Sequence, residues 1–210
     1  MSSVIIVPVR DRDTHLNCFR LYMREYFPQL PIIVVEQADN GKWNKGLLFN
    51  AAYKELANEY DYLILHDVDM IPQRNFDYSP TTIPTLLATE YSQFDYGQCY
   101  STFFGGVVGL PRNHYLLVNG FSNQFRGYGA EDDSFYRSFI QKGITPAIRS
   151  GNRVECFAHP RPKDPVDYNH NLKVLDAGRN FSEGLSTANY QVSGKMVTHN
   201  YTHLKINTIV

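Results

Sequence analysis

Two groups of carboxylates have the residue types and spacing to do chemistry. The first is Asp67 and Asp69, an i, i+2 pair directly after the apolar run Tyr62 to Leu65. In open α/β sheets, ligands bind beyond the carboxyl ends of the strands. One carboxylate there can accept a hydrogen bond from a ribose hydroxyl, and the other can bind a divalent cation that bridges a diphosphate. A solvated turn also explains a bare acidic pair, but the apolar approach favours the functional interpretation.

The second group is Glu131, Asp132 and Asp133, which follows the glycine-rich stretch Gly127-Tyr128-Gly129. Crowded carboxylates repel one another, so the pKa of at least one is raised, and this suits a general base. Acidic residues in a first helical turn also complement the helix dipole and the free N–H groups. The sequence leaves both interpretations open.

Apolar runs indicate the elements that position the first group. Three buried strands are predicted at residues 4–9, 31–36 and 62–65, and two helices at residues 12–27 and 47–56. This βαβ order is typical of an α/β fold with a Rossmann-like, mostly parallel central sheet flanked by helices.

Beyond residue 75 the periodicity weakens. It predicts helices at residues 80–94, 112–118 and 131–142, a strand at 100–110 interrupted by two glycines, and a strand-like tail at 189–206. Residues 160–185 contain three prolines and many polar groups, so we expect a long mobile loop or lid there.

Composition excludes several classes of partner. The formal net charge of -1 argues against nucleic acid and anionic membranes. No apolar run reaches the ~18 residues of a membrane span, and the first residues lack the basic region of a signal peptide. The three scattered cysteines do not suggest a disulfide framework and favour a reducing compartment. We therefore expect one cytoplasmic domain over residues 1–210.

These motifs, taken in order, resemble the β-1,4-galactosyltransferases, an inverting, metal-dependent family with the GT-A fold. The matching segments are VPVRDRDTHL (7–16), WNKGLLFNAAY (43–53), HDVDMIP (66–72), FFGGVVGL (103–110), NGFSNQFRGYGAEDDSF (119–135), ECFAH (155–159) and EGLSTANYQV (183–192). The block at 119–135 is the most specific. The absence of any evident anchor, stem or disulfide suggests a compact microbial or viral member.

The resemblance implies a nucleotide-binding half at residues 1–75. The residues expected to bind the UDP-sugar are Pro8, Arg10, Arg12, Trp43, Asn44, Lys45, Asp67, Val68 and Gly106. Asp69 and His159 are implied as ligands of Mn²⁺, with Cys156 as a tentative third ligand where the family often has methionine. Arg161 or Lys163 is the candidate to replace a phosphate-contacting lysine of the family.

The resemblance also implies an acceptor-binding half at residues 76–210. Asp132 is implied as the catalytic base. The implied acceptor-binding residues are Phe103, Tyr128, Gly129, Glu131 and Asp133. Phe103 stands where, by analogy, the family separates UDP-galactose from UDP-GalNAc, and its bulk suits galactose.

The predicted function is transfer of galactose from UDP-galactose to a carbohydrate hydroxyl, forming a β-1,4 linkage. One alternative is a UDP-GalNAc or UDP-glucose transferase of the same fold, and another is a catalytically silent carbohydrate-binding domain. A metal-dependent nucleotidyltransferase is disfavoured, because residues 7–16 contain no glycine for a phosphate loop.

Overall fold

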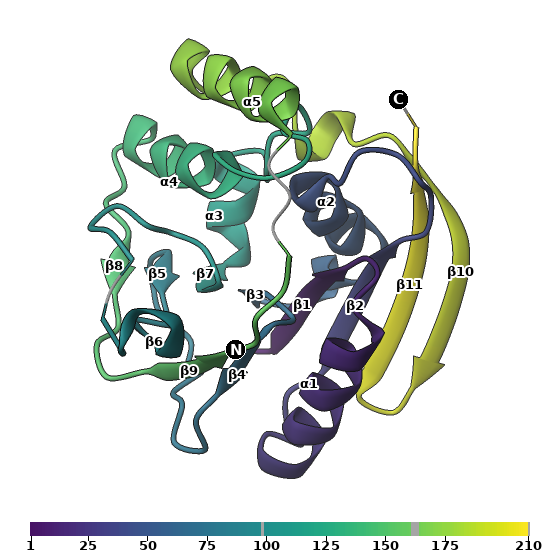
Figure 1. Ribbon diagram of the computed structural model, residues 1–210, viewed down its shortest axis with the longest axis vertical. Helices are drawn as coiled ribbons and strands as arrows, with labels where there is room; N and C mark the ends of the chain where they lie inside the picture. The colour runs from purple at the N-terminus through teal and green to yellow at the C-terminus, as the bar shows by residue number, and fades with distance from the viewer. Residues whose placement is uncertain (98, 161–163, 210) are drawn as a thin grey trace.

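The computed structural model describes residues 1–97, 99–160 and 164–209. Within these residues, eight strands form one sheet in the order β10-β11-β2-β1-β3-β7-β5-β8 (Figure 1). The strands are β1 Ser3–Val9, β2 Ile32–Gln37, β3 Tyr62–His66, β5 Thr85–Leu86, β7 Val107–Pro111, β8 Ala147–Ile148, β10 Tyr190–Thr198 and β11 Tyr201–Thr208.

The centre of this sheet is parallel, as the sequence predicted. Strands β11, β2, β1 and β3 pair in parallel, and β7 then runs antiparallel to β3. The carboxyl ends of β1 and β3 therefore share one edge of the sheet. Residues 10–12 and 67–69, which follow these two strands, lie along that edge.

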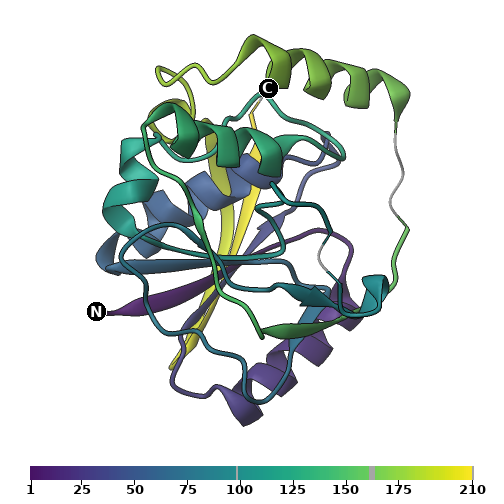
Figure 2. The ribbon, with the colours of Figure 1, turned by 90° about the vertical axis from the view of Figure 1, so that its left-hand side faces the viewer.

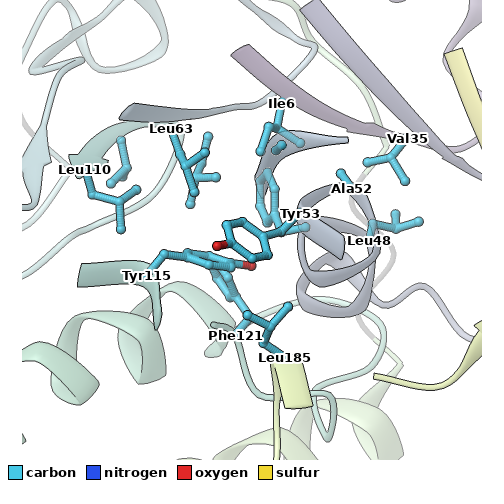
Figure 3. Close-up of a cluster of buried hydrophobic side chains, with 14 of the residues drawn as sticks. Ile6, Val35, Leu48, Ala52, Tyr53, Leu63, Leu110, Tyr115, Phe121 and Leu185 are labelled. Carbon is cyan, nitrogen blue, oxygen red and sulfur yellow. The ribbon is translucent and has the colours of Figure 1, made fainter. Parts of the chain in front are cut away.

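Helices cover both faces of the sheet because the central strands are buried on both sides. Val4 and Ile6 of β1 face a cluster that contains residues of helices α2 Lys45–Glu55, α3 Arg112–Leu117 and α4 Glu131–Gln141 (Figure 3). Ile5 and Val7 face the opposite cluster, which contains residues of helix α1 Asp13–Tyr26. In the described part of the chain, no helix is long and apolar enough to cross a membrane.

A smaller sheet lies on the α1 side. Its strands, in the order β4-β9-β6 among the described residues, are β4 Met70–Pro72, β9 Arg153–Cys156 and β6 Glu90–Tyr91. Strand β4 starts one residue after Asp69, and its Met70 is paired in antiparallel register with Cys156. This pairing brings residues 156–159 to the acidic pair, although they are far away in the sequence.

The helix predicted at residues 80–94 is wrong. This segment contains the short strands β5 and β6 and a 3₁₀ turn, η2 Ser92–Phe94. Pro84 would fall inside such a helix, where proline removes a backbone N–H group and clashes with the preceding turn. The apolar residues instead complete the edge of the large sheet, where β5 pairs with β7.

The loop predicted at residues 160–185 is also wrong in its centre, which forms helix α5 Pro165–Ala177. Asp164 caps the helix by accepting from the Val166 N–H at 2.8 Å, and Gly178, with φ 78°, ends it. These are ordinary start and stop signals. They were obscured because two of the three buried residues of α5 are polar, so the apolar periodicity is weak. Helix α5 lies on the outside of the molecule beside α4 (Figure 2).

Most of the remaining predicted elements are confirmed with small changes of boundary, and two differ more. The strand predicted at 100–110 begins only at Val107, after the two glycines. The strand-like tail is a hairpin of two strands, β10 and β11, and β11 extends the parallel part of the sheet beside β2.

Candidate active site

Lys45 joins the two groups of carboxylates. It is the first residue of α2, because Asn44 caps the helix by accepting from the Leu47 N–H at 2.9 Å. The Lys45 ammonium Nζ lies 3.0 Å from Asp67 Oδ1 and 3.2 Å from Asp132 Oδ1. The residue expected to bind nucleotide and the residue expected to act as base are therefore held by one cation.

Burial shapes the proton affinity of this cluster. The Asp132 side chain is 18% exposed, and burial raises its pKa to about 8, with Lys45 opposing and the charges of Glu131 and Asp67 adding to the rise. Burial also raises the pKa of Glu131. Burial lowers the pKa of Lys45, but the charges of Asp132 and Asp67 outweigh this and raise it well above its ordinary value. Lys45 therefore stays charged, while Asp132 can exchange a proton near neutral pH.

The acidic turn lies in the first turn of α4 and also makes tertiary contacts. The cap residue of α4, Ala130, makes no side-chain cap hydrogen bond. Asp132 binds Lys45, and Asp133 Oδ1 accepts from the hydroxyl of Tyr100 at 2.8 Å. Glycine at position 105 leaves room for the Asp132 carboxylate, because a Cβ atom there would lie 2.2 Å from Asp132 Oδ2.

Asp69 and His159 form a second polar centre at the same edge. His159 Nε2 lies 2.9 Å from Asp69 Oδ2, and the two side chains are 17% and 9% exposed. A six-coordinate hard cation with bonds of about 2.1 Å places adjacent ligands about 3 Å apart. Carboxylate oxygen and imidazole nitrogen are also donors that Mn²⁺ accepts. The pair therefore fits two adjacent ligands of such an ion.

The second ring nitrogen of His159 has two competing partners. Nδ1 lies 3.0 Å from Arg12 Nη2 and 2.9 Å from the Pro160 carbonyl oxygen. It cannot accept from the guanidinium and donate to the carbonyl at the same time. With the proton on Nδ1 and bound to Pro160, the lone pair of Nε2 faces Asp69, which is the form that a metal ligand needs.

Cys156 lies next to this centre, but its thiol does not complete a cluster. Burial raises the pKa of the Cys156 thiol, and the charge of Asp69 raises it further, so the group stays protonated. Among the residues that the structure describes, no set of three or more His, Cys, Asp or Glu side chains is arranged to hold a metal ion. Ligation by Cys156 therefore stays a prediction.

Most of the other residues expected to bind nucleotide line the same edge. The Arg10 guanidinium lies over the Trp43 ring, 5.6 Å from its centroid, and donates to the Gly41 carbonyl at 2.6 Å. The Gly106 carbonyl accepts from the Asp67 N–H at 2.8 Å. Pro8 and Val68 are buried in the framework. Arg161 and Lys163 lie outside the described residues.

The residues expected to bind the acceptor lie around the acidic turn. The Phe103 ring makes an edge contact with Tyr100, with 5.4 Å between the ring centroids. Tyr128 is 38% exposed. Gly129 has a φ of 103°, and a Cβ atom there would lie 3.0 Å from Tyr168 Cε2.

Several contributors to this region, including Asn171 of α5, were missed from the sequence. Tyr100 was missed because nothing in its local pattern indicates a contact with Asp133. Lys42 and Asp167, whose Nζ and Oδ2 lie 2.8 Å apart, tie α5 to the segment before Trp43. The capping signal at Asp164 could have revealed α5 and thereby placed Asp167 on a helix.

Solved structures of other proteins share this fold. The structure is similar to the catalytic domain of Drosophila β1,4-galactosyltransferase 7 in a complex with xylobiose, with a TM-score of 0.82 and 24% identity over 99% of this chain and 94% of that one. A second structure of the Drosophila enzyme, a mutant in complex with manganese, UDP-Gal and xylobiose, gives a TM-score of 0.83. The fold is thus that of the GT-A glycosyltransferases.

Family profiles cover most of the chain. Residues 1–79 match a profile described as the N-terminal region of glycosyl transferase group 7, and residues 85–161 match one described as the N-terminal domain of galactosyltransferase. The chain belongs to this galactosyltransferase family.

Two relatives are named for transfer of different sugars. Human β-1,4-galactosyltransferase 7 is 31% identical over 203 residues, which is 91% of this chain and 62% of the relative. A Lymnaea stagnalis β-1,4-N-acetylglucosaminyltransferase acting on β-N-acetyl-D-glucosaminides is 41% identical over 156 residues, which is 70% of this chain and 31% of the relative. The chain thus spans less than two thirds of the length of either relative.

Proposed function

We propose that this protein is an inverting, metal-dependent glycosyltransferase that moves galactose from UDP-galactose to a hydroxyl of a carbohydrate acceptor, forming a β-1,4 linkage. The observation that carries the proposal is the joint position of two centres at one sheet edge. Lys45 binds both Asp67 and Asp132. Asp69, two residues after Asp67, lies against His159.

Asp132 is suited to take the proton from the acceptor. A general base is most effective when its pKa lies near the working pH, and burial raises the pKa of Asp132 to about 8. The acceptor oxygen attacks the anomeric carbon, its proton passes to Asp132, and the bond from that carbon to the UDP oxygen breaks with inversion. Such a base contributes about 10²–10⁴-fold to the rate.

The nucleotide is expected to bind at the other centre, which contains Asp69 and His159. Asp69 and His159 would hold the divalent cation, which when bound supplies positive charge to the departing diphosphate oxygen. Asp67 is available to the ribose or uridine, and Arg10 with Trp43 forms a cationic and aromatic surface near it. In this proposal residues 1–75 bind nucleotide and residues 76–210 bind the acceptor.

The donor sugar has a second candidate. The Lymnaea relative is named an N-acetylglucosaminyltransferase, whereas the human relative is a galactosyltransferase. We place galactose first because Phe103, which lies against Gly105, packs edge-on against Tyr91, which lies beside Gly106, with 5.8 Å between the ring centroids. A donor with a bulky 2-acetamido group needs more room there. The expected cytoplasmic location stays a prediction.

The test is incubation of the protein with Mn²⁺, a panel of UDP-sugars and acceptors that end in xylose or N-acetylglucosamine. We expect a galactosylated product, with the linkage read by NMR and no product after EDTA treatment. Transfer only from UDP-GlcNAc or UDP-GalNAc would replace the donor assignment. Absence of transfer from every UDP-sugar would refute the proposed function.

A further inference from the structure

Asn171 is a polar residue in the middle of α5 with no exposed surface. Its amide nitrogen Nδ2 donates to the carbonyl oxygens of Arg126 and Gly129, at 2.8 and 3.0 Å. Its Oδ1 accepts from the Arg126 N–H at 3.1 Å. All three partners are backbone groups of the loop at residues 126–129, which ends three residues before Asp132.

These bonds hold a loop that regular secondary structure cannot hold. Gly127, Gly129 and Ala130 have φ values of 68°, 103° and 72°, which lie outside the helix and strand regions. Besides the bonds to Asn171, the Gly127 N–H donates to the Trp43 carbonyl at 2.8 Å. A buried amide that loses its partners costs about 1–3 kcal/mol, so the Asn171 side chain and this loop conformation require each other. Asn171 thus fixes the backbone of a distant segment and not that of its own helix.

Other contacts of α5 anchor its N-terminal half. Lys42 binds Asp164 and Asp167 at 3.1 and 2.8 Å, and His170 Nε2 lies 3.0 Å from the Gln124 carbonyl oxygen. Residues 164, 167 and 171 recur at helical spacing and lie on one face. Asn171 is the one among them that bonds directly to the peptide groups of residues 126 and 129.

We propose that Asn171 is a positioning residue for the acceptor: it fixes the loop at residues 126–129, so that Tyr128 and the first turn of α4 are in place before the acceptor sugar binds. This inference rests on the proposed function. A loop ordered in advance binds without an ordering cost, whereas a loose loop must be ordered by the acceptor itself. Loss of Asn171 should therefore weaken use of the acceptor and leave UDP binding, which lies on the strand-end side, unchanged.

Three variants test this role. Asn171→Ala removes all three hydrogen bonds, and Asn171→Asp keeps the acceptor oxygen with nearly the same shape but loses both donors. Asn169→Ala is the matched control, because Asn169 is on the same helix but exposed. For both Asn171 variants we expect an acceptor KM raised about tenfold or more and a UDP Kd within about twofold of the wild-type value. Hydrolysis of the UDP-sugar by water should persist, so the ratio of hydrolysis to transfer should rise.

A second readout does not depend on activity. In Asn171→Ala, amide hydrogen exchange at Arg126 should accelerate, and in Asn169→Ala it should not. Should the alanine variant fail to fold, Asn171→Asp still carries the comparison of acceptor KM with Asn169→Ala, although it keeps the oxygen that accepts from the Arg126 N–H. The inference is overturned if the acceptor KM of the Asn171 variants equals that of Asn169→Ala, or if UDP affinity falls in parallel with it. A wild-type protein that transfers no sugar, with Arg126 exchange changing as expected, would refute the proposed function while leaving the loop contact established.

Discussion

The strand-end wall of the site, Lys45, Asp67 and Asp69, is formed where β3 ends and α2 begins. The loop wall, residues 126–133, consists of a glycine loop and the first turn of α4. The strand-end wall is positioned by backbone hydrogen bonds of the parallel sheet and by the Asn44 cap. The loop wall is positioned by side chains from distant elements, above all Lys45, Tyr100 and Asn171. Regular structure fixes one wall, and individual polar contacts fix the other.

This difference has a consequence for mutation. A substitution in the strand-end wall should remove one ligand contact and leave the framework intact, because the sheet holds it. A substitution that supports the loop wall should change how the acceptor is held, because few contacts share that task. The predictions below separate the two walls, in order of decreasing effect.

The largest effect is expected for Asp132→Asn in the loop wall. Transfer should fall by about 10²–10⁴-fold, because asparagine cannot take the acceptor proton. UDP affinity should stay within about twofold of the wild-type value, since the nucleotide is expected on the strand-end wall. Steady-state transfer and UDP titration calorimetry measure the two quantities. A variant with full activity would show that Asp132 is not the base.

The strand-end wall is tested by His159→Gln and Asp69→Ala. Affinity for Mn²⁺ in the presence of UDP should fall by more than about tenfold in each, because one of the two proposed ligands is lost. Calorimetric titration with MnCl₂ measures it. His199→Gln, in the exposed turn between β10 and β11, is the control and should behave as the wild type. Equal Mn²⁺ affinity in all four proteins would place the metal elsewhere.

The raised pKa of Asp132 makes the stability of the folded protein depend on pH. Its pKa is raised from the model-peptide value of 3.8 to about 8, so between these pH values the folded protein binds more protons than the unfolded chain. The contribution of this carboxyl to stability is therefore complete below pH about 4 and is lost as the pH rises through about 8. Asp132→Asn lacks this dependence.

We expect the melting temperature of the wild type, relative to that of Asp132→Asn, to fall as the pH rises from about 5 to 9 without metal or nucleotide. Scanning calorimetry at a series of pH values measures the difference. The charged groups that face Asp132 are Lys45, Glu131 and Asp67, and all three remain in both proteins. A constant difference across this range would contradict the raised pKa.

The smallest effect is expected for Ala130→Gly, at the junction of the glycine loop and α4. Ala130 has a φ of 72°, a conformation that costs a residue with a Cβ atom about 1 kcal/mol relative to glycine. The variant should gain up to that amount in free energy of unfolding, as read by urea denaturation. Ala188→Gly, where φ is -59°, should lose stability. A loss in both would mean that position 130 carries no backbone strain.

The strand-end wall could be predicted from the sequence because its signals are local. Three apolar runs and the acidic pair after the third give the parallel sheet and the position of Asp67 and Asp69. The loop wall could not be predicted in the same way. The sequence predicts a loop where α5 lies, because two of the three buried residues of this helix, Asp167 and Asn171, are polar and leave no apolar period.

The pair of Asp69 and His159, the proposed metal site, could be predicted only in part. The resemblance indicated His159, but no local pattern brings it to Asp69. That approach depends on the pairing of β4 with β9, which joins residues 86 positions apart at Met70 and Cys156. Non-local pairings of this kind are set by the whole fold.

The most direct test of the account is the position of manganese in crystals of the protein grown with MnCl₂ and UDP, located by anomalous scattering. We expect one ion bonded to Asp69 Oδ2 and His159 Nε2, with the diphosphate bound to it and the Asp132 carboxylate facing the open side of the same cleft. An ion bound away from both residues, or a nucleotide bound on a face that Asp132 does not reach, would contradict the account.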